Sequence, residues 1–364
     1  MRWQPVCAAL AWGLVVTPSS PAQVPAKYKP TIKKGLDWLA RAQNKRTGSW
    51  EGTGGNYPVA MTGLAGMALL SEGSTVQQGK YAKNLRKARD WLISQSQPNG
   101  LITNPRDSAQ GSRYMYGHGF ALLFLSCVYG EERDVEERKK LEDVLTRAAQ
   151  FTRDAQTSRG GWGYVSAKDG NGFDEGSVTI TQLQGLRAAR NAGIKVPPEA
   201  IKDAVKYLND STGPDGGVIY SLAQGGRGPG RPSLTAAAIC CGFAAGEYDN
   251  KLVKKWFEFC QRHIPVVGGA RIGHDEYTHY YYAQAIYALG DKGLARLFPE
   301  TKGTDRLTWK KYREATFDLL VKTQRSDGSW SGQNWTARFG EVYVTSAFLT
   351  IMQLDNNVLP IYQK

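Results

Sequence analysis

Apolar residues follow a helical period along most of the chain, in two kinds of segment that alternate. In residues 31–43 the apolar positions Ile32, Leu36 and Leu39 form one stripe between charged positions, which predicts an amphipathic helix facing a core. In residues 59–70 nearly every position is small or apolar, which predicts a helix buried on most sides. One structural unit is therefore an outer helix, a turn and an inner helix.

The same couplet returns along the chain, which predicts an all-α protein made of six helix pairs. We expect the pairs to cover residues 31–74, 84–130, 141–193, 201–246, 250–290 and 309–355. Inner helices that are apolar all round need neighbours on both sides, and a closed (α/α)6 toroid provides these more fully than an open solenoid. Residues 23–364 should thus form one domain. The inner helices would run parallel, and their N-termini would meet at one mouth where helix dipoles favour an anionic group.

A short phrase joins each outer segment to its inner segment. It consists of a glutamine, a few connecting residues, and then glycine, a small residue and tryptophan. The clear copies run from Gln43 to Trp50, from Gln156 to Trp162 and from Gln324 to Trp330, and weaker copies run from Gln95 to Leu101, from Thr212 to Val218 and from Gln261 to Ala270. We expect these residues to be structural.

The phrase resembles the QW repeat of the terpenoid cyclase and protein prenyltransferase superfamily, which includes the squalene-hopene cyclases. The resemblance covers essentially the whole chain after residue 22. It implies an (α/α)6 toroid in which the glutamine bonds toward the next helix and the tryptophan packs beside it. Because these residues are structural, the resemblance implies a fold rather than a reaction.

The catalytic motifs of that superfamily are missing from the matching positions. Where the cyclases place the acid motif that protonates an alkene, this chain has Ser177 and Val178 in one inner segment and Ser233 and Leu234 in another. The zinc ligands of the prenyltransferases are also missing, since no cysteine stands two residues after Asp275 and no histidine stands in the last inner segment. We therefore expect neither a metal nor a cofactor.

The candidates for function stand just before or at the start of the inner segments. Carboxylates and a histidine can exchange protons, so Asp174, Glu175, His274 and Asp275 are candidate catalytic residues, although acids at a helix start also commonly complement its dipole. The candidate ligand-binding residues of the rim are Tyr57, Arg113, Tyr116, His118, Arg231, Arg271, Tyr277, Tyr280 and Glu341. A glycine- and proline-rich loop at residues 222–232 is long enough to cover the mouth.

The composition narrows the partners further. The formal net charge of +13 favours acidic partners, but the basic residues are scattered over outer segments without a dense run, which argues against nucleic acid. Cys127, Cys240, Cys241 and Cys260 lie in apolar stretches without metal-site spacing and are expected to be buried thiols. A disulfide between Cys260 and Cys240 or Cys241 stays open as an alternative.

Residues 1–22 have the pattern of a secretory signal. A charged start precedes an apolar stretch, which is followed by small residues that end at Ala22. The apolar stretch is too short to anchor the chain permanently in a membrane. We therefore expect an exported protein, periplasmic or secreted, without a stable membrane anchor.

Three functions are compatible with these features. The first is an exported protein whose central cavity binds an apolar or isoprenoid-like small ligand. The second is a polysaccharide lyase-like enzyme acting on an acidic glycan. The charge and proton-transfer groups for it would come from Arg113, His118, Arg271, His274 and Tyr277. The third is a non-catalytic scaffold that kept the ring. In each case we expect a monomer that does not bind nucleic acid.

Overall fold

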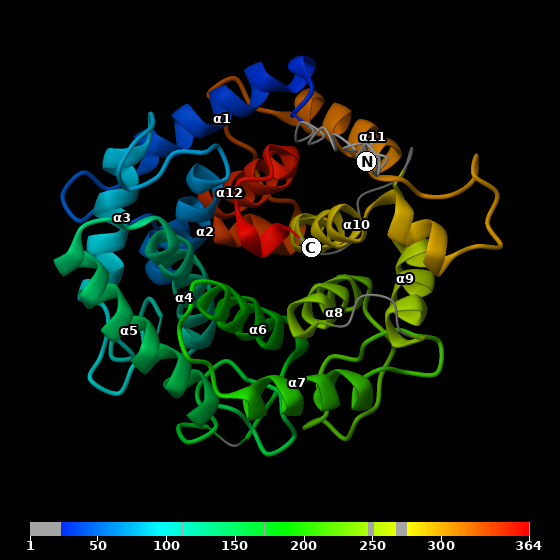
Figure 1. Cartoon of the computed structure of the whole chain (residues 1–364), viewed down its shortest axis with the longest axis horizontal. Coiled ribbons are helices and arrows are strands. Elements are labelled where there is room, and N and C mark those ends of the chain that lie inside the picture. The colour runs from blue at the N-terminus through cyan, green and yellow to red at the C-terminus, as the bar shows by residue number, and fades with distance from the viewer. Residues whose placement is uncertain (1–22, 111, 171, 247–250, 267–274, 364) are drawn as a thin grey trace, which may run out of the picture.

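The computed structural model describes residues 23–110, 112–170, 172–246, 251–266 and 275–363, which fold into two concentric rings of α-helices (Figure 1). The outer helices are α1 (Lys29–Ala42), α3 (Ala82–Ser94), α5 (Val135–Asp154), α7 (Pro198–Asp210), α9 (Lys251–His263) and α11 (Trp309–Thr323). The inner helices are α2 (Pro58–Leu70), α4 (Tyr114–Glu131), α6 (Gly176–Asn191), α8 (Pro232–Ala245), α10 (Asp275–Leu297) and α12 (Glu341–Met352). The predicted all-α (α/α)6 toroid is confirmed. The predicted signal segment 1–22 lies outside the described residues.

The two rings differ in burial as the hydrophobic pattern predicts. All thirteen residues of α2 are buried, whereas α1 buries a stripe that includes Ile32, Leu36 and Leu39. Consecutive inner helices contact one another, and contacts between α12 and α2 close the ring. Gly290, with φ 65°, breaks the helical conformation inside α10, and a further turn continues to Leu297. None of the helices in the described ranges is long and apolar enough to cross a membrane.

The glutamines of the clear phrases bridge successive outer helices. Nε2 of Gln43 donates to the carbonyl oxygen of Gly48 at 2.7 Å and to that of Asn84, in α3, at 2.9 Å. Gln156 makes the same two bonds to Gly160 and Ala200, and Gln324 makes them to Gly328 and Thr31. Since Thr31 belongs to α1, the bond from Gln324 ties the last pair to the first and closes the outer ring.

The tryptophans of the same phrases join each outer helix to its inner helix. Trp162 is fully buried, its backbone N–H donates to Thr179 Oγ1 of α6 at 3.1 Å, and its indole N–H donates to the carbonyl oxygen of Thr152 in α5 at 2.7 Å. Trp50 bonds to Thr62 and Leu39 in this way, and Trp330 bonds to Thr345 and Leu320. These indoles are part of the packed core.

In the phrases that the described residues include, the turn glycine packs against the backbone of the next outer helix. Gly328 has φ 103°, and a Cβ at this position would lie 2.5 Å from the carbonyl oxygen of Lys34 in α1. Gly160, with φ 91°, is packed in the same way against the carbonyl of Asp203 in α7. Only glycine combines a positive φ with so close an approach.

The second helix pair departs from the predicted register. Gly100 has the positive φ of the turn glycine, so Ile102 and not Leu101 occupies the position of the tryptophan. The side-chain amide of Gln95 donates to Ser94 Oγ, in its own helix, where the glutamines of the clear phrases donate to the next outer helix. The backbone N–H of Ile102 donates to Nδ1 of His118 at 3.1 Å, so His118 replaces the threonine that the inner helices α2, α6, α8 and α12 use.

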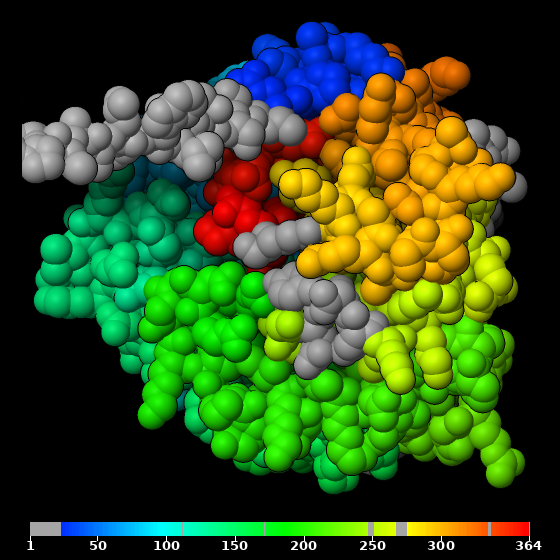
Figure 2. Space-filling model, turned by 45° about the vertical axis from the view of Figure 1, so that its right-hand side comes forward, coloured from blue at the N-terminus to red at the C-terminus, as the bar shows by residue number. Residues whose placement is uncertain are grey.

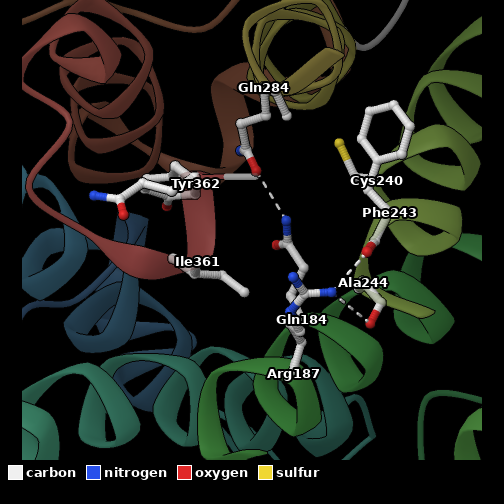
Figure 3. A pocket seen from close by; sticks show the side chains of 10 residues that line it. Gln184, Arg187, Cys240, Phe243, Ala244, Gln284, Ile361 and Tyr362 are labelled. Carbon is white, nitrogen blue, oxygen red and sulfur yellow. Dashed lines mark hydrogen bonds between the residues drawn. The ribbon is translucent and has the colours of Figure 1, made fainter. Parts of the chain in front are cut away.

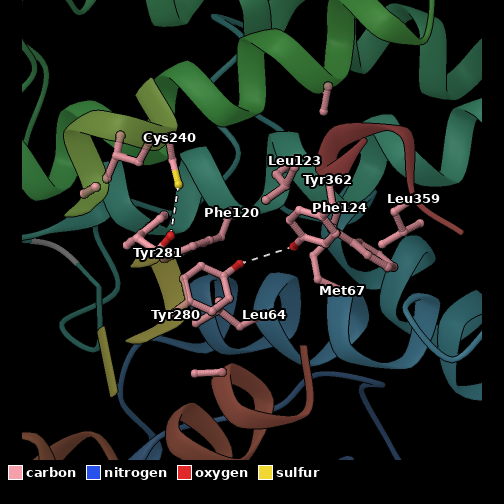
Figure 4. Close-up of a cluster of buried hydrophobic side chains, with 14 of the residues drawn as sticks. Leu64, Met67, Phe120, Leu123, Phe124, Cys240, Tyr280, Tyr281, Leu359 and Tyr362 are labelled. Atoms are coloured by element: carbon pink, nitrogen blue, oxygen red, sulfur yellow. Dashed lines mark hydrogen bonds between the residues drawn. The ribbon is translucent and has the colours of Figure 1, made fainter. Parts of the chain in front are cut away.

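The centre of the ring is filled by side chains (Figure 4). Leu64, Phe120 and Tyr281 come from three inner helices and are at most 6% exposed. The C-terminal segment enters from the C-terminal ends of these helices and places Tyr362 at 3.5 Å from the hydroxyl of Tyr280. Figure 2 shows this segment, in red, in the middle of one face of the molecule.

A small cavity lies beside the C-terminal segment (Figure 3). It measures about 30 Å³, which is room for about one water molecule. Gln184 and Gln284 face each other across it, with Nε2 of Gln184 donating to Oε1 of Gln284 at 2.8 Å. This cavity is therefore too small for a ligand of isoprenoid size.

The four cysteines of the described chain are free thiols. Cys240, Cys241 and Cys260 are buried and Cys127 is half-buried. Burial raises the pKa of each of these thiols, so they stay protonated and unreactive near neutral pH. The disulfide alternative for Cys260 is not formed in this structure.

Candidate functional site

The inner helices begin at one end of the ring, the mouth, where a group of half-buried aromatic side chains gathers. We call Tyr116, Tyr164, Tyr220 and Tyr277 the tyrosine cluster. The hydroxyls of Tyr164 and Tyr220 share a hydrogen bond, and the ring centroids of Tyr116 and Tyr164 lie 5.9 Å apart. The hydroxyl of Tyr277, from α10, donates to the carbonyl oxygen of Ser177 in α6 at 3.3 Å. The cluster thus brings together residues of the second, third, fourth and fifth helix pairs.

A buried carboxylate, Glu175, lies beneath the tyrosine cluster. It caps the N-terminus of α6, accepting from the backbone N–H groups of Ser177 at 3.1 Å and Val178 at 3.2 Å. The hydroxyl of Tyr116 donates to its Oε2 at 3.1 Å, and the hydroxyl of Ser177 donates to the same oxygen. Burial raises the pKa of Glu175, although these donors oppose the shift. The carboxylate is therefore a fixed part of the floor of the site.

Two arginines flank the tyrosine cluster, and we call them the arginine pair. Arg113 precedes α4 and places its guanidinium carbon 4.5 Å from the ring centroid of Tyr164. Arg231 precedes α8 and lies 4.3 Å from the ring centroid of Tyr220. Among the described residues neither guanidinium forms an ion pair or a side-chain hydrogen bond. Two guanidinium groups without an ion-pair partner among the described residues therefore lie over the two tyrosine rings whose hydroxyls are bonded to each other.

The mouth has a second aromatic group on the opposite side of the ring, where the first pair meets the last. Tyr57 packs edge-on against Phe339 with centroids 6.0 Å apart, and Phe339 packs against Tyr343 at 5.6 Å. Tyr57 has φ 53°, a left-handed conformation that is uncommon for a residue with a side chain. Glu341 is paired with Arg325 at 3.1 Å and helps to hold the last pair together.

Asp174, a candidate catalytic residue, is fully engaged in structure. Its Oδ2 accepts from Nε of Arg159 at 2.6 Å. Its Oδ1 accepts from the hydroxyls of Tyr207 at 3.2 Å and Ser221 at 3.1 Å, and from the backbone N–H of Leu222 at 2.8 Å. The carboxylate has no side facing a ligand, so its role is to fasten the loop at residues 221–223 beside the mouth.

The substitution Asp174→Ala should lower the free energy of unfolding by about 2–3 kcal/mol, because it leaves several buried donors without an acceptor. The matched control is Asp143→Ala, which removes an exposed ion pair with Arg147 and should cost at most about 0.5 kcal/mol. Chemical denaturation measures both values, and hydrogen exchange should show faster exchange at Leu222 in the Asp174 variant. Equal costs for the two variants would contradict the anchoring role.

Asp275 and His279 lie next to each other at the start of α10. Nε2 of His279 lies 3.4 Å from Asp275 Oδ1, and its Nδ1 shares a hydrogen bond of 2.7 Å with the hydroxyl of Tyr312. The neighbouring Glu276 accepts from Gln333 N–H and from the hydroxyl of Thr336, which fastens another loop beside the mouth. Within the described ranges no group of three or more His, Cys, Asp or Glu residues could hold a metal ion.

Other predicted rim residues lie elsewhere. His118 is completely buried beneath the mouth, where it accepts a hydrogen bond from the backbone N–H of Ile102. Tyr280 points into the packed ring centre. Neither residue therefore lines the rim. Arg271 and His274 lie outside the described residues. Of the predicted set, Arg113, Tyr116, Glu175, Arg231 and Tyr277 come together at the tyrosine cluster.

The prediction from sequence missed Tyr220. Tyr164 stands two residues after Trp162, and Tyr220 stands two residues after Val218, which occupies the tryptophan position in the fourth pair. A strict alignment of the helix pairs would therefore have placed both tyrosines at one level of the ring. The match between Tyr164 and Tyr220 was not apparent because the copy of the phrase in the fourth pair, from Thr212 to Val218, has no tryptophan.

The fold and the mouth define a closed (α/α)6 toroid with an aromatic, arginine-flanked site where its inner helices begin. Comparison with solved structures places the chain among toroids of different activities. The type II terpene cyclase MstE from Scytonema is similar with a TM-score of 0.57 and 15% identity, covering 92% of this chain and 100% of that chain. An inactive variant of an α-1,6-mannanase from Salegentibacter, in complex with α-1,6-mannotetrose, gives a TM-score of 0.63 and 9% identity, with the same coverage.

A crystal structure of a protein from Actinoplanes gives a TM-score of 0.56 and 17% identity, covering 90% of this chain and 99% of that chain. The chain matches no protein-family model and no curated protein sequence. At these identities the likeness establishes the fold alone. It confirms the toroid expected from the QW-like phrase and leaves the chemistry to the residues of the mouth.

Proposed function

We propose that this protein binds a glycan at the mouth, with the sugar rings lying against the tyrosine cluster. The observation behind the proposal is that Tyr116, Tyr164, Tyr220 and Tyr277 are only partly buried, so each residue keeps some exposed surface while its hydroxyl is held by a hydrogen bond. Aromatic rings with a wet polar edge suit a ligand that has both apolar faces and hydroxyl groups. A sugar has both.

The same geometry disfavours the alternative of an isoprenoid held in a central cavity. The ring centre is occupied by Leu64, Phe120, Tyr281 and the C-terminal segment, and the cavity beside that segment is about 30 Å³. An isoprenoid chain would need these buried side chains to move apart, which costs the packing energy of the core. The solved mannanase, whose structure contains α-1,6-mannotetrose, provides a precedent for sugar binding on this fold.

Binding rather than turnover is the part of the proposal that the site supports. Burial raises the pKa of Tyr116, Tyr164, Tyr220 and Tyr277, so in the free protein these hydroxyls stay protonated and do not supply a phenolate base. Glu175 is occupied by four donors from Tyr116, Ser177 and Val178. The candidate proton-transfer groups thus hold the site in shape.

Isothermal titration calorimetry with α-1,6-mannotetraose, trigalacturonate and the methyl ester of trigalacturonate tests the proposal. We expect at least one of these oligosaccharides to bind, and we expect Tyr164→Ala and Tyr220→Ala each to weaken that binding about tenfold or more. The matched control is Tyr287→Ala, which removes a half-buried tyrosine next to Trp309, outside the tyrosine cluster, and should leave binding unchanged. Melting temperatures establish that each variant is folded.

Binding of geranylgeraniol by the protein, without binding of any saccharide, would overturn the proposal in favour of the isoprenoid alternative. Accumulation of unsaturated uronates from polygalacturonate, followed by ultraviolet absorbance, would extend it from binding to catalysis. If none of these ligands binds and no unsaturated uronate accumulates, the scaffold alternative is favoured.

We further propose that the protein is exported, on the pattern of residues 1–22. Finding the chain in the cytoplasm with these residues intact would contradict this.

A further inference from the structure

We infer that the arginine pair selects glycans that bear anionic groups, so that Arg113 and Arg231 recognise uronate carboxylates on sugars held by the tyrosine cluster. The inference rests on the proposed glycan binding and adds the chemical class of the ligand. It assigns a specificity role to two residues that belong to different helix pairs and lie on either side of Glu175, which caps the helix between them.

The way the two guanidinium groups are held leaves their donors free. Each lies over the face of a tyrosine ring, Arg113 on Tyr164 and Arg231 on Tyr220, at 4.5 and 4.3 Å from the ring centroids. Attraction of a cation to a ring face is electrostatic, so it does not occupy the hydrogen-bond donors of the guanidinium with an acceptor. Among the described residues no acceptor takes these N–H groups, so they are free to bind a carboxylate with two parallel hydrogen bonds.

Stacking also fixes the position of the two charges. A free arginine side chain loses considerable rotational entropy when it binds a ligand, and a stacked one has already lost part of it. The hydroxyls of Tyr164 and Tyr220 are hydrogen-bonded to each other. This bond links the cation–π pair of Arg113 to that of Arg231. The arrangement suits a ligand with anionic groups at two separated points, as in an oligouronate.

The charge balance of the mouth favours an anion. The carboxylate beneath the tyrosine cluster, Glu175, already accepts hydrogen bonds from Ser177, Val178 and Tyr116. Glu276, on the far side of the mouth, likewise accepts from Gln333 and Thr336. Asp174 is paired with Arg159, and Glu341 with Arg325, so these two carboxylates do not neutralise the arginine pair. The parallel N-termini of α4, α6 and α8 add positive dipole ends at the same place.

The test compares trigalacturonate with its methyl ester, which has the same rings without the charges, by calorimetry on the full protein. We expect the acid to bind at least tenfold more tightly and its affinity to fall as the salt concentration rises. Arg113→Gln and Arg231→Gln should each weaken binding of the acid about tenfold, as expected for the loss of a charge-assisted contact, and should weaken binding of the ester much less. Arg227→Gln removes an exposed arginine from the neighbouring loop and should change neither.

The outcomes separate this inference from the proposed function. Equal affinity for the acid and the ester, or full acid binding by both arginine variants, overturns the anion selectivity while glycan binding stands. If no saccharide binds but geranylgeranyl phosphate does, and if its binding depends on Arg113 and Arg231, the arginine pair binds a phosphate. The proposal of glycan binding is then wrong. Binding of neither ligand overturns both.

Discussion

Replacing Trp162 with alanine should lower the free energy of unfolding by about 3–5 kcal/mol, the range for removing a large buried aromatic side chain. Trp162 is fully buried, and its indole N–H donates to the carbonyl oxygen of Thr152 in the preceding outer helix. The substitution both opens a cavity and leaves that carbonyl without its donor. Denaturant unfolding followed by circular dichroism measures the change.

Trp91→Ala provides the matched control for this prediction. Trp91 lies on the outer helix α3, is half-buried, and makes no side-chain hydrogen bond in the described structure. Its removal should cost clearly less than that of Trp162, about 1–2 kcal/mol. If the two alanine variants unfold at the same denaturant concentration, Trp162 contributes no more to stability than a half-buried tryptophan, and its proposed role in joining α5 to α6 is wrong.

Acidification should destabilise the protein through His118. This histidine is completely buried, and burial lowers its pKa from 6.5 to about 3. Its Nδ1 accepts from the backbone N–H of Ile102, so the ring proton is on Nε2 and points at Thr152 Oγ1, which itself donates to the carbonyl oxygen of Ala148. A second proton on Nδ1 would face the N–H of Ile102, donor against donor.

The direction of the pH dependence follows from this shift. The pKa of His118 is lower in the folded than in the unfolded state, so below pH 6.5 the unfolded state binds a proton that the folded state does not. Stability is therefore lost as the pH falls from about 6.5 toward 3, by roughly 3 kcal/mol between pH 7 and pH 4. Urea unfolding at a series of pH values measures the loss.

A variant separates His118 from the acidic residues that also titrate in this range. Gln can accept from Ile102 with its amide oxygen and donate to Thr152 with its amide nitrogen, but it has no ionisation. His118→Gln should therefore flatten the dependence by about 3 kcal/mol relative to the wild type, whereas His263→Gln, at the exposed end of α9, should not. A parallel curve for His118→Gln would show that this residue does not cause the acid sensitivity.

The joints between helices were largely predictable because they depend on local spacing. Gln43, Gln156 and Gln324 stand at the ends of outer helices and reach the turn and the next outer helix, as the phrase leads one to expect. The connection between α3 and α4 was predicted incorrectly, because Ile102 stands at the tryptophan position there and His118 stands at the threonine position. A hydrogen-bonding role passed to a different residue type, which spacing alone does not reveal.

The candidate site was predictable only in part. The rule that function gathers where inner helices begin brought Arg113, Tyr116 and Tyr277 into the prediction, but it also included His118 and Tyr280, which point inward. Helical spacing gives the level of a residue along the ring axis, and the rotation of each helix then decides whether a side chain faces the mouth or the core. A helix that is apolar all round has no stripe from which that rotation could be read.

By itself, the sequence determined the helical class, the six pairs and the closure of the ring, because these follow from the period of apolar residues and from a repeated local phrase. Only the tertiary structure decided that the ring centre is packed and that Asp174 fastens a loop. It alone also brought Arg113 and Arg231 to the two sides of the tyrosine cluster. Several of these features depend on contacts between residues far apart in the sequence, such as Asp174 with Leu222 and Arg113 with Tyr164, and such contacts exist only once the helices have packed against one another.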